Sequence, residues 1–150
     1  MNASPERAAQ VAVVKWMRLV LPRGSIVFAV KNEHAPRSMT TGGRMAFFAK
    51  RKAEGVKSGI PDLGILIAGP RLLMLEMKRP GGDDVLSDKQ QGVHEDLAAL
   101  GIAVGLGDSI ESARGFLLAH GVTLREASGQ AVSVAKVRRA KRIPRDPIPF

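Results

Sequence analysis

The sequence predicts an α/β fold, a mixed β-sheet with a central antiparallel hairpin and helices on its flanks. Segments with helical periodicity alternate along the chain with short apolar segments typical of strands. Two of these apolar segments, 63–68 and 72–79, are separated only by Gly69-Pro70-Arg71, which predicts a hairpin. A further apolar strand is expected at 102–106. The order helix, strand, helix, hairpin, helix, strand, helix therefore predicts a mixed sheet covered by helices.

The first helix is expected to begin after Ser4, which is a good N-cap, with Pro5 at the first helical position. It should continue to about Leu21, because Pro22 cannot extend it. The β-branched and aromatic residues of 25–30 then predict a short strand.

The next segment, 31–43, is polar and contains a Gly42-Gly43 pair, so it is expected to be a loop. A helix is expected at 44–54 and should end at Gly55.

The last two helices are expected at 87–100, ended by Gly101, and from Asp108 or Ser109 to about His120.

Length and composition indicate one domain followed by a tail. A chain of 150 residues can form one domain with a hydrophobic core, here expected at 1–125. Residues 126–150 are basic and punctuated by prolines, which is typical of a tail. No apolar run approaches the ~20 residues that span a bilayer, so no membrane partner is expected. The chain has no cysteine, which fits a cytoplasmic protein of phage or bacterial type.

The charge distribution favours a polyanionic partner. The net charge is +9, yet residues 59–130 carry 6 basic and 10 acidic side chains. Residues 31–58 carry 7 basic and 2 acidic side chains, and 131–150 carry 6 and 1. An acidic centre between basic segments suits a metal site that faces a phosphate backbone. A solvated surface with an ordinary basic tail would give the same counts.

The residues that carry chemistry lie on and before the expected hairpin. Asp62 precedes its first strand, while Glu76 and Lys78 are two residues apart on the second and so share one face. Carboxylates and water are the ligands that Mg²⁺ prefers, and Mn²⁺ is the alternative ion. Asp62, Glu76 and the backbone carbonyl of Met77 are the candidate ligands, and Lys78 could orient water or stabilise charge.

This site requires a particular hairpin register. If paired residue numbers sum to 138, Asp62 lies opposite Glu76, whereas a two-residue turn at Gly69-Pro70 gives 139 and places them on opposite faces. The metal site therefore needs a three- or five-residue turn, a bulge, or an Asp62 that precedes regular pairing. Pro61 favours the last option, because it has no N–H to donate to a ladder.

Three motifs resemble the VRR-NUC (virus-type replication-repair nuclease) family of the PD-(D/E)xK restriction-endonuclease-like superfamily. They are Gly-Ile-Pro-Asp-Leu at 59–63, Glu-Met-Lys at 76–78 and Leu-Ser-Asp-Lys-Gln at 86–90. Glu6 and Gln10 match the early helical glutamate and the glutamine four residues later. The resemblance covers roughly residues 4–120 and implies a restriction-endonuclease-like core.

By this resemblance, Asp62, Glu76 and Lys78 take the metal and catalytic positions, with Glu6 and Gln90 as accessory catalytic residues. Small members of the family are similar to dimeric phage enzymes that act on branched DNA. The resemblance thus implies a homodimer whose substrate is a Holliday junction, flap or nicked DNA.

Each of these residues also has an ordinary structural interpretation. Asp62 could cap a turn, and Glu76 with Lys78 could be an exposed pair on an edge strand. Ser87-x-x-Gln90 is a capping box, and Gln90 could serve both the cap and the site. Lone histidines such as His34 and His94 are more often ordinary surface residues than metal ligands.

Phosphate contacts are expected from six basic residues and one serine, although a solvated helix face explains the residues at 44–57 nearly as well. The set is Arg44, Lys50, Arg51, Lys52, Lys57, Ser87 and Lys89. Aromatic residues make up only 4% of the chain and tyrosine is absent. Stacking along a single strand is therefore poorly supported, and recognition of backbone and shape fits better.

Three functions remain open from the sequence. The first is a metal-dependent DNA endonuclease, and the second is a non-catalytic DNA-binding module or accessory subunit with a nuclease-like fold. The third is an RNA nuclease, because nothing in the motifs reads the sugar.

Overall fold

The computed structural model describes residues 4–30 and 38–125. The expected tail and most of the expected loop at 31–43 lie outside the described residues. The elements in chain order are α1 (Pro5–Val20), β1 (Ile26–Ala29), α2 (Thr41–Ala53), β2 (Leu63–Ile67), β3 (Arg71–Met77), α3 (Asp88–Ala99), β4 (Ala103–Gly107) and α4 (Ile110–Ala119).

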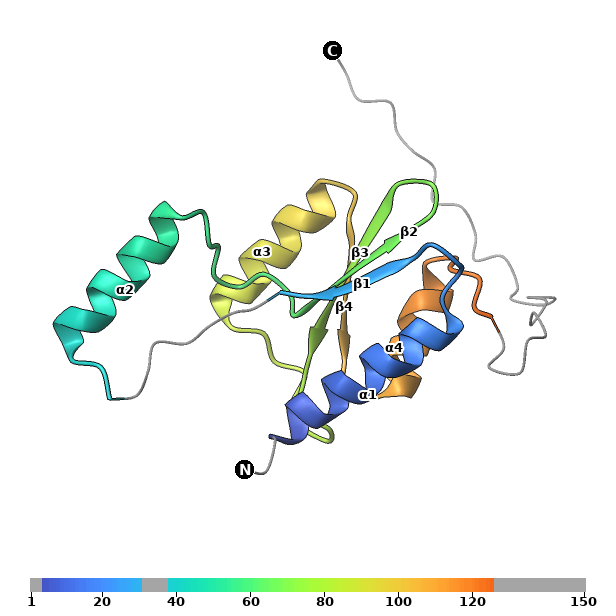
Figure 1. Cartoon of the computed structure of the whole chain (residues 1–150), viewed down its shortest axis with the longest axis horizontal. Helices are drawn as coiled ribbons and strands as arrows, with labels where there is room; N and C mark the ends of the chain where they lie inside the picture. The colour runs from blue at the N-terminus through green and yellow to red at the C-terminus, as the bar shows by residue number, and fades with distance from the viewer. Residues whose placement is uncertain (1–3, 31–37, 126–150) are drawn as a thin grey trace, which may run out of the picture.

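The four strands form one mixed sheet in the order β1-β2-β3-β4. β1 pairs antiparallel with β2, β2 pairs antiparallel with β3, and β3 pairs parallel with β4. The parallel pair is connected through α3, which crosses from the end of β3 to the start of β4 (Figure 1). The predicted α/β class and the central hairpin are confirmed.

The hairpin has the register that the site requires. Leu63 pairs with Leu75 and Ile67 pairs with Arg71, so paired residue numbers sum to 138. The turn consists of residues 68–70, and Gly69 supplies the positive φ of 87° that it needs. The predicted turn at Gly69-Pro70-Arg71 was one residue too late, because Arg71 already belongs to the ladder.

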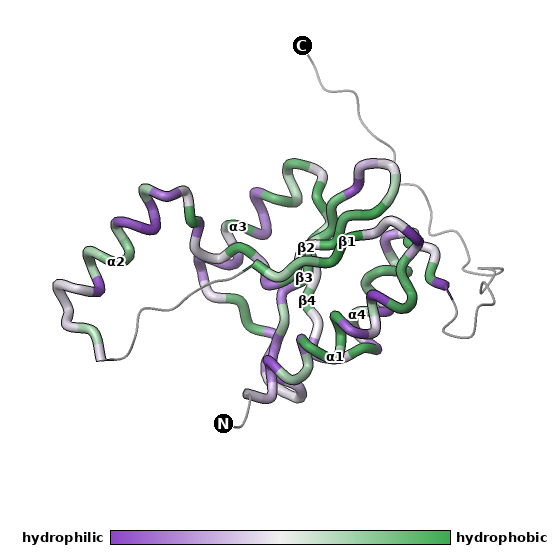
Figure 2. The backbone as a smooth tube through the Cα atoms, in the orientation of Figure 1, coloured by the Kyte–Doolittle hydropathy of each residue, from purple (hydrophilic) through white to green (hydrophobic). Residues whose placement is uncertain are grey.

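One face of the sheet carries the main core. Because side chains alternate along a strand, the odd-numbered residues of β2 and β3 share this face. They are Leu63, Ile65, Ile67, Leu73, Leu75 and Met77, all buried. They pack with Val13 and Met17 of α1 and with Leu117 of α4. Figure 2 shows the corresponding apolar colouring of the strands.

The other face of the sheet is only partly covered. α3 contacts β4 and buries Val93 on this side. Glu76 belongs to this face, since it alternates with the core residues of β3. Over β1 and β2 the side chains of Ile26, Phe28 and Leu66 remain exposed. The face of the sheet that carries Glu76 is therefore exposed over β1 and β2.

The helix caps follow the sequence closely. Ser4 accepts a hydrogen bond from the Arg7 N–H and begins α1, and Ser109 rather than Asp108 is the N-cap of α4. The part of the chain that the structure describes contains no helix long and apolar enough to cross a membrane.

α2 differs from the prediction at its start. It begins at Thr41, not at 44, because the Thr40 hydroxyl accepts the Gly43 N–H at 3.2 Å and caps the helix. Gly42 and Gly43, predicted in a loop, are therefore helical. α2 has no buried residue and projects away from the sheet (Figure 1).

Candidate active site

Asp62 is fixed from both neighbouring strands. Its carbonyl accepts the Val30 N–H at 2.7 Å, and its Oδ2 accepts the Met77 N–H at 2.9 Å. Extending the hairpin register by one residue places Asp62 opposite Glu76. The N–H and C=O of a residue in an antiparallel ladder point to the same side, so the Met77 carbonyl lies on the side of Asp62. The Asp62 carboxylate, the Glu76 carboxylate and the Met77 carbonyl thus lie together at one end of the hairpin.

Glu76 is a buried carboxylate with one unused oxygen. The residue is 4% exposed. Its Oε1 accepts a hydrogen bond from Gln90 Nε2 and lies 3.5 Å from Lys78 Nζ. Its Oε2 is buried and has no hydrogen-bond partner among the described residues. Such an oxygen is costly to leave unpaired, and a strong cation or donor would relieve that cost.

Gln90 lies in the first turn of α3 and contacts the side chains of both Glu76 and Lys78. Its Oε1 accepts from the Ser87 N–H at 3.0 Å and lies 3.4 Å from Lys78 Nζ, while its Nε2 donates to Glu76. The capping box predicted from Ser87-x-x-Gln90 is present. The same amide therefore caps α3 and contacts the site, as the sequence allowed.

The two carboxylates have raised pKa values. Burial, and then the neighbouring charge of Asp62, raise the pKa of Glu76 from 4.5 to about 7, against the opposing effect of Lys78. The charge of Glu6 contributes in the same direction. Burial also raises the pKa of Asp62, although the Met77 N–H and Lys78 oppose the shift. Burial thus disfavours the charged form of both carboxylates despite Lys78, and a proton or a cation is favoured there.

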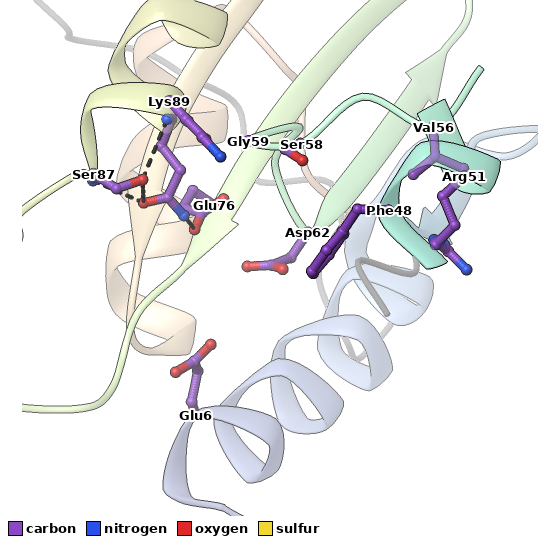
Figure 3. A pocket seen from close by; sticks show the side chains of 11 residues that line it. Glu6, Phe48, Arg51, Val56, Ser58, Gly59, Asp62, Glu76, Ser87 and Lys89 are labelled. Atoms are coloured by element: carbon purple, nitrogen blue, oxygen red, sulfur yellow. Dashed lines mark hydrogen bonds between the residues drawn. The ribbon is translucent and has the colours of Figure 1, made fainter. Parts of the chain in front are cut away.

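A cavity of about 310 Å³ opens above these carboxylates (Figure 3). It is lined by Glu6, Phe48, Arg51, Val56, Ser58, Gly59, Asp62, Glu76, Ser87, Lys89 and Gln90. Glu6 lines it from the first turn of α1. Segments that are up to 84 positions apart along the chain therefore share one site.

Within residues 4–30 and 38–125, no group of three or more histidine, aspartate or glutamate side chains could hold a metal ion. An ion at Asp62 and Glu76 would therefore depend on backbone and water oxygens for its remaining ligands. Glu6 lines the cavity without joining such a group, which fits an accessory position rather than a ligand.

The expected phosphate-contacting residues divide into two groups. Arg51, Ser87 and Lys89 line the cavity. Lys50 pairs with Glu54 at 3.8 Å on α2, and Lys57 pairs with Asp96 at 3.2 Å. The remaining two, Arg44 and Lys52, are exposed on α2. The second group could contact DNA outside the cavity but does not reach the carboxylates.

Two features of the site were missed in the sequence. Phe48 lines the cavity, and nothing in the composition distinguished it from the other four phenylalanines. His94, interpreted as an ordinary surface residue, has a buried Nε2 with no hydrogen-bond partner among the described residues. Burial, and then Lys78, lower its pKa. His94 follows Gln90 by four residues, about one helical turn, and this spacing was the sequence signal that could have placed His94 near the site. His34 lies outside the described residues.

Gly59 sets the position of α3 beside the site. Its φ is +86°, and a Cβ there would lie 2.6 Å from the Lys89 carbonyl oxygen. We expect Gly59→Ala to lower the free energy of unfolding by about 2–3 kcal/mol, because backbone strain and a backbone clash combine. Gly55 has φ +85° and open space around it, so Gly55→Ala should cost only about 1 kcal/mol. Urea denaturation measures both, and equal losses would contradict the steric role of Gly59.

The fold and site together define a nuclease-type α/β domain, with an acidic pair and a lysine at the end of its central hairpin. The VRR-NUC domain matches residues 4–111, and the chain therefore belongs to the VRR-NUC family, a nuclease family. A solved structure described as a VRR_NUC domain protein superposes with a TM-score of 0.56 at 24% sequence identity. The alignment covers 81% of this chain and 91% of that one, and at this identity the likeness is one of fold. No curated protein matches the chain.

Proposed function

We propose that the protein is a Mg²⁺- or Mn²⁺-dependent DNA endonuclease of the PD-(D/E)xK type. The observation that carries this proposal is the buried Glu76 carboxylate, whose Oε2 has no partner among the described residues although Asp62 and Lys78 lie beside it. A purely structural carboxylate would be expected to satisfy both of its oxygens. A carboxylate kept for an ion would leave one oxygen free.

The residues fit a hard divalent cation. Asp62, Glu76 and the Met77 carbonyl would hold it, since all three supply oxygen, and a cation would offset the burial that raises the pKa of both carboxylates. When bound, such an ion supplies neutralisation of the scissile phosphate and activation of water.

The chain's own side chains would complete the site. Lys78 is held between Glu76 and Gln90, and from there its ammonium would stabilise charge on the phosphate or orient the attacking water. Gln90 donates to Glu76 Oε1 and so leaves Oε2 for the ion. Glu6 lies at the cavity wall, where it could orient water.

We infer a branched or otherwise structured DNA substrate and a homodimeric enzyme. The family is a nuclease family, and this chain carries a net charge of +9. α2 carries several basic residues and projects away from the sheet, which suits contact with more than one DNA segment. A twofold symmetric pair would cut two strands of a junction at related positions.

The proposal is tested with wild-type protein and a set of DNAs of one sequence: four-way junction, flap, nicked duplex and linear duplex. Cleavage is expected with Mg²⁺ or Mn²⁺, none with EDTA, and faster reaction on the branched substrates. Cleavage that persists in EDTA would refute metal dependence, and equal rates on all four would refute structure selectivity. An RNA duplex of the same sequence should be cut at least tenfold more slowly if DNA is the substrate.

The exposed basic helix α2 also favours a second candidate, a DNA-binding module without catalysis. Arg44 and Lys52 lie on it away from the carboxylates. This candidate predicts salt-sensitive DNA binding, no hydrolysis with any metal, and binding unchanged by Asp62→Asn. The nuclease proposal predicts hydrolysis that depends on the carboxylates.

A further inference from the structure

α2 places one aromatic ring at the wall of the site. Phe48 lines the same cavity as Asp62 and Glu76, yet it is 48% exposed. Figure 3 shows its ring beside Asp62, with Arg51 of the same helix next to it. The exposed part of this ring is available to contact a ligand in the cavity.

Packing among the residues that the structure describes leaves about half of the Phe48 side chain exposed, at 48%. α2 buries none of its residues. The neighbouring Phe47 makes an edge-to-face contact with Phe48 at 5.5 Å, and the Arg51 guanidinium lies 5.4 Å from the Phe47 ring. Phe47 thus contacts both Phe48 and Arg51 of this helix. Phe48 has the Phe47 contact on one side and the cavity on the other.

The charges of the residues that line the cavity indicate which part of a DNA strand the Phe48 ring would contact. A phosphate is repelled by Asp62 and Glu76 except where a cation bridges them, and Arg51 and Lys89, which line the same cavity, could contact it as well. A nucleobase carries no charge, and its π-face stacks on an aromatic ring whatever its identity. Bases inside a duplex are already stacked on their neighbours, so only an unpaired or extruded base could reach the ring.

The size of the cavity supports a single nucleotide. Its volume is about 310 Å³, at the lower end of the ~300–1,000 Å³ typical of ligand pockets. We propose that Phe48 stacks on one unpaired nucleobase adjacent to the scissile phosphate, and that the enzyme thereby selects DNA with an unpaired nucleotide at the cleavage point. This inference rests on the proposed nuclease function and specifies its substrate. It is compatible with a chain poor in aromatics, because it needs a single stack rather than a row of them.

Substitutions at Phe48 separate stacking from apolar bulk. Phe48→Ala and Phe48→Leu both lose the ring, and Phe48→Leu keeps an apolar side chain, whereas Phe48→Trp keeps a stacking surface. The matched control is Met45→Ala, which removes a side chain that is 71% exposed on the same helix and does not line the cavity. Single-turnover cleavage is measured on a flap and on a fully paired nicked duplex of the same sequence.

Phe48→Ala and Phe48→Leu are expected to slow flap cleavage by about 5- to 150-fold, the range for loss of one base stack. Cleavage of the paired duplex should change less than twofold, and Phe48→Trp and Met45→Ala should resemble the wild type on both DNAs. Equal slowing on both DNAs, or full activity of Phe48→Leu on the flap, would overturn the proposal.

A binding readout does not depend on hydrolysis. The flap carries 2-aminopurine at its first unpaired position, and Ca²⁺ replaces Mg²⁺. Wild type and Phe48→Trp should quench the fluorescence of this base, and Phe48→Ala should bind with little quenching. Quenching that is the same in Phe48→Ala would overturn the stack. If no metal supports cleavage by the wild type, the nuclease proposal fails, while this signal still decides the role of Phe48.

Discussion

Asp62→Asn and Lys78→Ala are each expected to reduce metal-dependent cleavage by at least about 10²- to 10³-fold, the range for loss of one group that stabilises developing charge. Asp62→Asn keeps the shape of the side chain and an oxygen that can accept the Met77 N–H, but it removes a negative charge needed for the ion. Lys78→Ala removes the ammonium that lies 3.5 Å from Glu76 Oε1. Neither change alters the apolar core.

Matched controls are available for both variants. Asp83→Asn changes an exposed carboxylate in the segment before α3, and Lys15→Ala removes an exposed lysine of α1. Neither residue lines the cavity, so both variants should cut at the wild-type rate. DNA affinity, measured by fluorescence anisotropy in Ca²⁺, should fall less than tenfold in Asp62→Asn and Lys78→Ala. Wild-type cleavage by either of these two would show that the site has been assigned to the wrong residues.

Glu76→Gln is expected to abolish cleavage and yet to stabilise the metal-free protein at pH 8. The native pKa of Glu76 is about 7 and its ordinary value is 4.5, so between these pH values the folded state binds more protons than the unfolded state. The free energy of unfolding of the wild type therefore falls as pH rises from about 4.5 to about 7, and then levels. The total loss from this group is up to about 3 kcal/mol. Because glutamine does not titrate, the variant lacks this loss.

Urea denaturation at pH 4.5, 6, 7 and 8 in EDTA measures the effect. The two proteins should be similar in stability at pH 4.5, and the variant should be more stable at pH 8. Excess Mg²⁺ should raise the stability of the wild type alone, because only the wild type binds the ion. Glu95→Gln, at an exposed position of α3, controls for the loss of a surface carboxylate. Parallel curves for wild type and Glu76→Gln across this range would refute the buried-charge account.

The secondary structure was largely predictable because its signals are local. Ser4, Ser87 and Ser109 cap the helices that the sequence assigned to them, with Ser109 chosen from two candidates. The start of α2 was misjudged, because Gly42-Gly43 suggested a loop while the Thr40 cap favoured a helix. There the local cap outweighed the low helix propensity of glycine.

The Asp62–Glu76 pair was predictable only up to a condition on the register. From the sequence, the numbers of paired hairpin residues could sum to 138 or to 139. The three-residue turn at 68–70 fixes the sum at 138. The remaining members of the site depend on tertiary structure. Glu6 and Phe48 reach the cavity from elements far apart along the chain, and periodicity alone cannot place one element against another. The buried Nε2 of His94 is likewise a property of packing.

The most direct test of the central claim is the anomalous diffraction signal of Mn²⁺ in crystals of the protein soaked with that ion. A manganese peak is expected within metal–oxygen bonding distance of an Asp62 oxygen, Glu76 Oε2 and the Met77 carbonyl, and it should be lost in Glu76→Gln. A peak elsewhere, with Glu76 Oε2 still unpartnered, would contradict the account.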